Sequence, residues 1–470
     1  MNVNIVTDVQ SGLRQKAKYG LTILLKPLRL DVRFTNSLVD GSLNIFYGET
    51  RPEKSKKIFF LSSSPDFQTC VSNSRLPSIE DVEWIDFSGK RIPRFFSKGR
   101  EEGEDIFSFD VVAATFMLAS NYQDLISTER DEYDRLRAMD SIQDRLNILN
   151  FPVVNYYSLL LKNALEKFFN IRIEQKDYSG AQSAVALTHD IDYTSSLNPK
   201  IIRRDILGHS ILNYTGLTQH ERTKKLLNPL AALIGRNPAK AGLSFLRETE
   251  LARDVRSTFF IKSGKSGKED VGYSIRSSTM KSFLKSLRDN GFEIGIHPSM
   301  KTYIDAGRLI TEKYLLEETS GTAVSSVRQH YLKFAAGTTI DVWEQAAMKY
   351  DSTLGFSRKV GFRNSVAFPF PLFNFRLDGI SAVEEIPLVF MDGTLAEDRT
   401  HSTYETFEIM TGLIREVKEA HGAAAVLFHN SLLDPIDFPG YGGIYSSLIN
   451  EIKGRGMKIG TVAEIAENFR

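Results

Sequence analysis

The sequence has little cysteine, little tryptophan and no marked excess of either charge. Its 470 residues include one cysteine, Cys70, and two tryptophans. A single cysteine excludes an internal disulfide framework and a cysteine-rich zinc site, so we expect Cys70 to be a buried bystander. The 59 basic and 58 acidic residues leave a net charge of +1. That balance offers no general attraction to nucleic acid or to an anionic membrane surface.

Long apolar runs are also missing. No stretch reaches the roughly 20 apolar residues that a membrane-spanning helix needs, and the N-terminus has no continuous apolar core of the signal-peptide type. We therefore expect a cytoplasmic protein without a membrane span. Hydrophobic residues still make up 42% of the chain. At this length, that content is enough for a sizeable core divided between two or three domains.

Residues 1–180 are predicted to form an N-terminal α+β accessory domain. Strand-like runs at 43–49 and 56–64 precede two segments, 109–126 and 156–171, whose apolar residues have helical spacing. Charges dominate residues 127–145 (STERDEYDRLRAMDSIQDR) between these segments, and we interpret them as a solvated helix or loop. Polar and small residues place the domain boundary near residue 180.

Beyond residue 180, short β-rich runs alternate with helical patterns. The runs are SAVALTHD (183–190), RSTFFIKSG (256–264), FEIGIHPS (292–299), SVRQHYLKF (326–334), VGFRNSVAF (360–368), VEEIPLVFMD (383–392) and AAVLFHNS (424–431). This alternation indicates a parallel sheet covered by helices, and it predicts a distorted (β/α) barrel of about seven strands in residues 181–470. A basic helical insertion at about 197–252 is expected to form either solvated surface helices or a cap over the substrate.

Ionisable residues end nearly all of these runs: Asp190, Asp192, His297, Arg328, His330, Arg363, Asp392 and His429. In parallel α/β barrels the functional groups come from the carboxyl ends of the strands, so we expect these side chains to share one cavity. Residues two apart in a strand face the same side. Two carboxylates placed together repel unless a cation lies nearby or one of them is protonated. One aspartate with two histidines is a ligand set suited to Zn²⁺.

At these residues the chain resembles the polysaccharide deacetylases of the NodB-homology type, also called carbohydrate esterase family 4. THDID (188–192) is similar to the first motif of the family, GIHPS (295–299) to the second, GFRNSVAFPF (361–370) to the fourth and VLFHNS (426–431) to the last. The resemblance covers roughly residues 184–470, and the N-terminal part is similar to the accessory domain of one bacterial subgroup. It implies a distorted barrel that removes acetyl groups from sugars with a bound metal.

The resemblance also implies a role for each matched residue. Asp190 is the expected catalytic base, Asp192 and His297 the expected metal ligands, and His429 the expected acid. Arg363 is expected to orient the base.

One position departs from the family pattern. The second motif usually has another histidine four residues after the first, where this sequence has Lys301. A charged ammonium cannot coordinate a metal, so we expect His330, at the end of the neighbouring strand, to supply the second imidazole. Tyr331 is a candidate for stacking on the sugar. For Arg328 and Asp392, a contact with substrate and a structural ion pair at the rim are both open.

The sequence therefore predicts a hydrolase that uses a divalent metal, Zn²⁺ by preference, to remove an N-acetyl or O-acetyl group from a sugar. The expected substrate is a precursor in surface polysaccharide biosynthesis, and no nucleic-acid partner is expected. Two alternatives remain. One is hydrolysis of another C–N bond, in a cyclic amide or formamide, on the same metal barrel. The other is a catalytically inactive carbohydrate-binding homologue, in which the change at Lys301 has ended catalysis.

Overall fold

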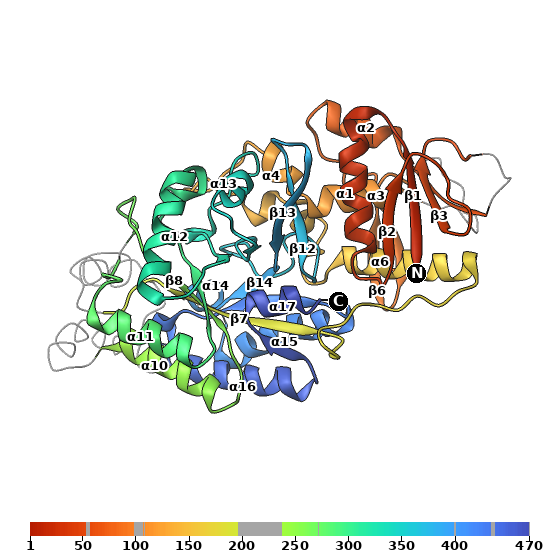
Figure 1. Ribbon diagram of the computed structural model, residues 1–470. Helices are drawn as coiled ribbons and strands as arrows, with labels where there is room; N and C mark the ends of the chain where they lie inside the picture. The colour runs from red at the N-terminus through yellow and green to blue at the C-terminus, as the bar shows by residue number, and fades with distance from the viewer. Residues whose placement is uncertain are drawn as a thin grey trace.

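The computed structural model describes residues 1–52, 57–97, 107, 109–195, 237–270, 272–398, 401–433 and 438–469. Within these residues the strands form a four-stranded sheet early in the chain, a ten-stranded sheet that begins with β7, and a two-stranded hairpin. Figure 1 places the first sheet and its helices beside the larger sheet, with the C-terminus close to the junction of the two.

The four-stranded sheet is parallel throughout, in the order β2-β1-β3-β4. Its strands are β1 (Asn2–Asp8), β2 (Asp31–Thr35), β3 (Leu43–Gly48) and β4 (Ile58–Ser62). Parallel neighbours need a crossover connection, and α1 (Arg14–Leu25) supplies it between β1 and β2. This arrangement is α/β, which corrects the α+β class expected for the N-terminal part. The apolar runs indicated strands there, but they carry no signal of strand direction.

The other elements before residue 180 surround this sheet. They are α2 (Pro65–Ser72), β5 (Glu83–Phe87), β6 (Lys90–Arg94), α3 (Val111–Ala119), α4 (Tyr122–Ile126), η2 (Ala138–Asp140), α5 (Ile142–Arg145) and α6 (Val153–Phe169), with η1 (Ser11–Leu13) before α1. Every residue of α3 is buried, because α1 and α6 pack against it. The two helical segments predicted from apolar spacing therefore correspond to α3 with α4 and to α6.

The larger sheet has the strand order β12-β13-β11-β10-β9-β8-β7-β15-β14, and β16 also pairs with β7. The strands are β7 (Ala184–Ile191), β8 (Thr258–Ile261), β9 (Glu293–Ile296), β10 (Ser326–Val327), β11 (Tyr350–Asp351), β12 (Phe370–Asn374), β13 (Gly379–Glu385), β14 (Leu388–Met391), β15 (Ala423–Leu427) and β16 (Lys458–Gly460). All pairings are parallel except that of β12 with β13. The result is a mixed α/β fold around a curled sheet (Figure 1).

The strands differ from the expected seven runs, and β11, β12 and β16 lie outside all of them. Pro387 separates β13 from β14 within the run 383–392, since proline has no N–H for the ladder. The run 360–368 is a buried loop: Gly361 N donates to Val389 O, and Phe362 N donates to Leu149 O, both at 2.7 Å. A short apolar run does not distinguish a strand from buried chain of another kind, so this expected strand was wrong.

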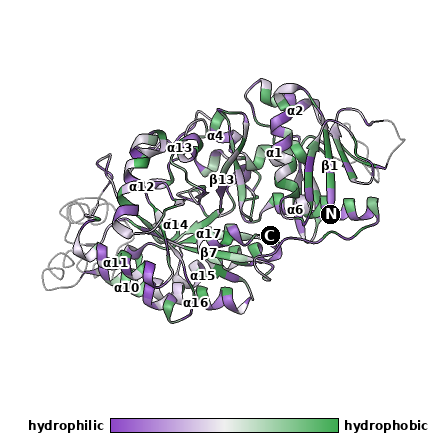
Figure 2. Cartoon of the chain, in the orientation of Figure 1, coloured by the Kyte–Doolittle hydropathy of each residue, from purple (hydrophilic) through white to green (hydrophobic). Residues whose placement is uncertain are grey.

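Helices cover the larger sheet. They are α10 (Pro238–Leu251), α11 (Ser278–Asp289), α12 (Ala306–Ser320), α13 (Thr339–Gln345), α14 (Asp392–Asp398), α15 (Thr403–Glu419), α16 (Tyr441–Gly454) and α17 (Val462–Glu467), with short turns η3 (Thr302–Ile304), η4 (His330–Leu332) and η5 (Asn430–Leu432). In Figure 2 the strand β7 is largely hydrophobic, and hydrophilic residues line the outer side of α11. Of the insertion expected at 197–252, residues 197–236 lie outside the described residues, and α10 forms most of the rest. No helix among the described residues is long and apolar enough to span a bilayer.

A single cluster of buried hydrophobic residues joins the two parts of the chain. The ring of Phe116 in α3 packs edge-on against Phe373 in β12, with 5.4 Å between the ring centroids. Asn155 in α6 donates from Nδ2 to the carbonyl oxygens of Ala367 and Ala420, at 3.1 and 3.2 Å. The first 180 residues are therefore packed into the same core as the larger sheet.

Candidate active site

The buried strand β7 brings two aspartates to the carboxyl end of the larger sheet. Asp190 lies in the strand and is buried, and Asp192 follows the strand and is half-buried. Asp190 Oδ2 is 3.8 Å from Nδ1 of His297, and Asp192 Oδ1 is 3.4 Å from Nε2 of the same ring. The two-residue spacing thus places both carboxylates beside one imidazole, as alternation along a strand requires.

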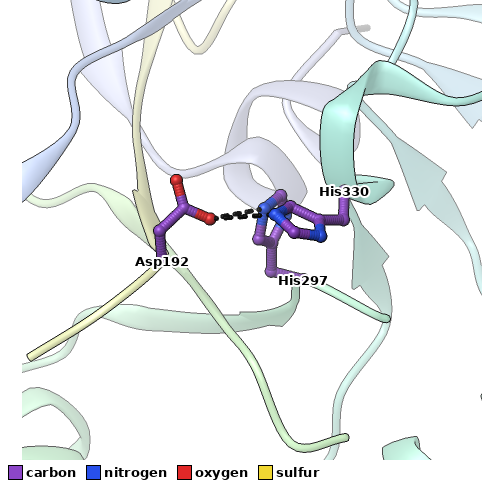
Figure 3. Close-up of side chains that lie close together, drawn as sticks. All are labelled: Asp192, His297 and His330. Atoms are coloured by element: carbon purple, nitrogen blue, oxygen red, sulfur yellow. Dashed lines mark ion pairs between the residues drawn. The ribbon is translucent and has the colours of Figure 1, made fainter. Parts of the chain in front are cut away.

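Three side chains converge where β7, β9 and β10 end. Asp192 Oδ1 lies 3.4 Å from His297 Nε2 and 3.3 Å from His330 Nε2, as Figure 3 shows. One atom from each residue lies within 4.8 Å of the other two. Ligand atoms at about 2.0–2.1 Å from a tetrahedral zinc ion are about 3.3 Å apart. The two measured separations therefore match those between the ligands of such an ion.

The other nitrogen of each histidine already has a partner. His297 Nδ1 is 2.7 Å from the Arg328 carbonyl oxygen, which can only accept a hydrogen bond, so Nδ1 of the neutral ring carries the proton. His330 Nδ1 is 2.9 Å from Asp270 Oδ1. Nε2 of each ring lies beside Asp192 Oδ1, at 3.4 Å for His297 and 3.3 Å for His330. Two ring nitrogens and a carboxylate oxygen that converge in this way fit a cation.

Burial alone would raise the pKa of the Asp192 carboxyl. Hydrogen bonding and charge interactions with His297 and His330 outweigh that effect and lower its pKa well below the usual value. Asp192 is therefore an anion at neutral pH, which is the form that coordinates a metal.

Asp270 is part of the site and was missed by the sequence analysis. It is buried in the loop after β8, where it accepts three backbone N–H groups and the hydroxyl of Ser266 in addition to His330. Burial raises the pKa of this carboxyl, but His330, the backbone donors and Lys262 together lower it well below the usual value. Asp270 is thus a fixed anion that sets the tautomer of His330. Its sequence context, GKSGKED, is typical of a solvated turn and gave no signal.

Lys262 is a second buried group that the sequence analysis did not single out. It follows β8, is 2% exposed, and places Nζ 3.2 Å from His330 Nε2 and 3.5 Å from Asp270 Oδ1. It therefore adds a positive charge beside the three candidate ligands. Lys301, which stands where the family has its second histidine, has an exposed side chain, and its backbone N–H donates to Ser266 Oγ at 2.8 Å.

Arg328 faces the proposed base from inside the sheet. Its Nη1 lies 3.8 Å from Asp190 Oδ1, and its Nη2 donates to the hydroxyls of Thr188 and Ser352 at 3.1 and 2.9 Å. The side chain is fully buried. Two alternatives were left open for Arg328, a contact with substrate and an ion pair at the rim. Its buried position beside Asp190 matches neither of them.

Arg363, the expected partner of Asp190, lies against the N-terminal part of the chain. Its Nη2 donates to Asp124 Oδ1 at 2.6 Å, its Nη1 donates to the Gly355 carbonyl at 3.0 Å, and the side chains of Arg363 and Asp124 are buried. Because residues 360–368 are a loop and not a strand, the side chain is directed to α4. The structure thus corrects its expected role, and Arg328 is the guanidinium that approaches Asp190.

His429 is paired with Asp392. His429 Nδ1 is 2.6 Å from Asp392 Oδ1, and the backbone N–H of His429 donates to Asp392 Oδ2 at 2.7 Å. Burial lowers the pKa of the imidazole, but Asp392, with further contributions from Asp192 and Asp190, raises it to about 10. Asp392 is fully buried and paired with His429, which favours the ion pair over the contact with substrate, the two alternatives left open for this residue.

Tyr331 lies beside the candidate ligand His330. Its half-buried ring is 4.5 Å from the ring of His330 and 4.6 Å from that of Tyr133, between centroids. Tyr133 belongs to the charged stretch 127–145, which we interpreted as solvated. That interpretation was wrong for this part of the stretch, because the high charge content concealed residues that face the sheet.

His189 points to the opposite side of β7 from the aspartates. Its Nε2 is 2.7 Å from Glu250 Oε1, which also accepts the hydroxyl of Tyr445 at 2.6 Å, and all three side chains are fully buried. This network ties α10 and α16 to β7, so His189 has a structural role.

Comparison with known proteins gives one family match and several solved structures. Residues 6–170 match the model of a family of unknown function, DUF7033. No curated protein matches the chain. A Mycobacterium smegmatis protein described as a polysaccharide deacetylase is 17% identical, with a TM-score of 0.42 over 61% of this chain and 90% of that chain.

Two other solved structures are more distant. The peptidoglycan deacetylase PdaC from Bacillus subtilis is 13% identical, with a TM-score of 0.31 over 61% of this chain and 91% of that chain. A CE4 family pseudoenzyme from Bacillus anthracis is also 13% identical, with a TM-score of 0.31 over 61% of this chain and 66% of that chain. At such distances, function has to be argued from the site itself.

Proposed function

We propose that this protein is a metal-dependent hydrolase that removes an acetyl group from a sugar. The observation that carries the proposal is the convergence of Asp192 Oδ1 with Nε2 of His297 and of His330, next to a buried aspartate and a charged histidine. The barrel of residues 181–470 is the proposed catalytic domain, and residues 1–180 form the proposed N-terminal domain.

The donor set fits a divalent ion of the zinc type. Two imidazole nitrogens and one carboxylate oxygen suit such an ion and leave a coordination position open. A zinc ion bound there would lower the pKa of a coordinated water and polarise the acetyl carbonyl.

Asp190 is the proposed general base. It lies 3.8 Å from His297, and Arg328 offsets its negative charge from the buried side at 3.8 Å. Asp190 Oδ1 is enclosed beside Arg328, whereas Oδ2 lies on the side of His297, so Oδ2 is the oxygen proposed to accept a proton from the attacking water.

His429 is the proposed general acid. Its raised pKa, about 10, keeps the ring protonated at neutral pH, and Asp392 holds it through Nδ1 and through the backbone. Nε2 is then the atom that donates a proton. An amine must be protonated to leave, so a charged donor favours an N-acetyl over an O-acetyl substrate. A sugar precursor of surface polysaccharide remains the proposed substrate class.

The test is acetate release from β-1,4-linked N-acetylglucosamine oligomers after chelation and re-addition of Zn²⁺ or Co²⁺. Asp190→Asn and His429→Gln should each lower the rate by a factor on the order of 10² to 10⁴, with metal content unchanged. His421→Gln, which changes a histidine that the site does not use, is the matched control. Wild-type protein that binds metal but releases no acetate from N-acetylated or O-acetylated sugars would refute the proposal. Formate or a ring-opened product would favour hydrolysis of another C–N bond.

One contact favours a second candidate, a carbohydrate-binding protein without hydrolysis. Lys262 Nζ lies 3.2 Å from His330 Nε2, so its ammonium supplies part of the positive charge that a metal would supply. Stoichiometric metal measured by elemental analysis, together with acetate release, would exclude this candidate.

A further inference from the structure

A segment of the N-terminal part holds the residue next to the candidate ligand His330. Arg135 Nη1 donates to the carbonyl oxygen of Tyr331 at 2.6 Å, across 196 positions of sequence. The ring of Tyr133 lies against that of Tyr331, which in turn contacts His330 edge-on. Tyr331 is therefore held through its backbone and through its ring.

The backbone at Tyr331 needs such support. Its φ and ψ are 60° and 17°, in the left-handed region, and the next residue, Leu332, also has a positive φ of 53°. Residues other than glycine rarely adopt this backbone conformation. Strain of this kind persists only where surrounding contacts fix it. Because His330 opens this turn, the conformation of the turn governs where its ring lies.

Arg135 is itself fixed before it reaches Tyr331. Its Nε and Nη2 donate to Asp131 Oδ2 at 2.8 and 2.7 Å, and Asp131 Oδ1 accepts the backbone N–H groups of Tyr133 and Arg135. The two side chains are 10% and 7% exposed. Burial raises the pKa of Asp131, but its bonds with Arg135 lower the pKa below the usual value. Because two of its nitrogens are already fixed on Asp131, the guanidinium is preorganised for a third contact.

The segment that holds Asp131, Tyr133 and Arg135 also follows a helix that is bonded to the larger part of the chain. It follows α4 (Tyr122–Ile126), where Asp124 binds Arg363 of the larger sheet's loop. Asn364 of that loop donates to Asn121 Oδ1 at 2.8 Å and to the Ala119 carbonyl at 3.0 Å. The N-terminal part is thus docked on the larger sheet immediately before the chain reaches Asp131.

We propose that Asp131, Tyr133 and Arg135 position His330 for metal binding, so that the N-terminal part completes the metal site. The inference rests on the proposed function, because it takes His330 as a ligand. The three are positioning residues, since they act through Tyr331 and not on the metal. This gives residues 6–170, which match a family of unknown function, a role in assembling the site.

The test measures Co²⁺ binding by the full-length, metal-stripped protein, through competition with a chelator and through the visible spectrum of bound Co²⁺. Arg135→Ala should weaken binding by about 10-fold to 100-fold, as expected when the support of a ligand is lost, and should alter the spectrum. Arg135→Lys should restore part of the affinity, because an ammonium can donate to the Tyr331 carbonyl. Arg137→Ala is the matched control: Arg137 lies in the same segment but pairs with Glu129 and Asp140.

A second variant background separates the effect of the contacts made by Arg135 and Tyr133 from general damage to the fold. Glycine adopts a φ of 60° without strain, so Arg135→Ala should cost much less Co²⁺ affinity in a Tyr331→Gly protein than in the wild type. Tyr133→Ala, which removes the ring contact with Tyr331 and the packing of the Arg135 guanidinium on the Tyr133 ring, should also weaken binding. Equal losses from Arg135→Ala in both backgrounds, or unchanged affinity and spectrum in Arg135→Ala, would overturn the inference and leave the proposed function intact. Wild-type protein that takes up no Co²⁺ would overturn both.

Discussion

At the scale of single residues, the site depends on which atom of each side chain is already bonded. His297 and His330 have the same ring, but one is oriented by a backbone carbonyl and the other by Asp270. The carboxylate is the stronger acceptor, because a hydrogen bond to a charged group is worth about twice a neutral one. His330 is therefore the more tightly fixed of the two candidate ligands.

The first prediction concerns Asp270→Asn. Removing the charge weakens the bond that fixes His330 Nδ1, and the new amide N–H₂ faces backbone N–H donors. Metal affinity should fall by about 10-fold to 100-fold in a chelator competition. Asp289→Asn, at an exposed position paired with Lys285, should leave the affinity unchanged. Wild-type affinity in Asp270→Asn would mean that His330 is oriented without this carboxylate.

A second prediction follows from the raised pKa of His429. A group whose pKa is raised by folding contributes stability that is complete below its unfolded pKa, about 6.5, and is lost as the pH rises through its folded pKa, here about 10. In Asp392→Asn the folded pKa of His429 should fall while its unfolded pKa is unchanged, so the loss of stability should begin at the same pH but be smaller and end at lower pH. Denaturant unfolding between pH 6 and 10 measures this change.

NMR of protein labelled at histidine gives the direct control for that prediction. Burial lowers the pKa of His421, and this histidine lies away from Asp392, so its titration should not respond to Asp392→Asn. A His429 titration that is also unchanged would show that Asp392 does not set its charge.

The candidate metal ligands could be predicted from the sequence, but the residues that support them could not. Asp190, Asp192, His297 and His330 end runs with clear strand character, and parallel strands bring such ends together. Asp270 and Lys262 reach the site from a loop whose residue pattern is that of a solvated turn. Arg328 and Arg363 both follow apolar runs, and only the path of the chain decides which of them faces Asp190.

At the scale of elements, the loop 360–368 determines how the two parts of the chain fit together. Gly361 has a φ of 129°, and a Cβ added there would lie 2.3 Å from the Leu149 carbonyl oxygen. Glycine is therefore required where this loop approaches the N-terminal part. The buried pair of Arg363 with Asp124 follows two residues later.

The third prediction is that Arg363 is structural. Arg363→Met leaves the charge of Asp124 buried and unpaired, which costs about 3–5 kcal/mol of unfolding free energy. The double variant with Asp124→Leu should recover most of that loss, while metal content stays at the wild-type level. Arg358→Met, which breaks an exposed pair with Glu132, should cost less than about 1 kcal/mol. Full stability of Arg363→Met with loss of activity would instead support the role near Asp190.

Helices and strands are predicted correctly from the sequence where the hydrophobic period and the length of a segment indicate the same kind of element. The runs that became β7, β8, β9 and β15 are apolar and end in polar residues, and α11 and α15 have clear helical spacing. The two-residue strand β11 is too short to produce a pattern. Strand direction in the N-terminal sheet depends on the crossovers, which hydrophobic period does not encode.

At the scale of the whole molecule, the two sheets share one hydrophobic core, and the N-terminal part meets the larger sheet through buried polar contacts as well. Domains joined through small polar interfaces move and unfold separately. Here Asn155 and the Asp124–Arg363 pair are buried at the junction, together with the stacked rings of Tyr178 and Phe469. Separating the two parts would expose all of these groups at once.

The fourth prediction is that the chain unfolds in one transition. Trp84 lies in β5 of the N-terminal part, and Trp343 is fully buried in α13 beside the larger sheet, so the two tryptophans report on different parts. Trp343→Phe leaves only Trp84 to fluoresce, and Trp84→Phe leaves only Trp343. In each variant the denaturation curve followed by fluorescence should coincide with that followed by circular dichroism, which is the test of two-state behaviour. If the Trp84 signal were lost at clearly lower denaturant than the circular dichroism, the N-terminal part would detach first. A part that detaches first could not hold Tyr331 and His330 in place.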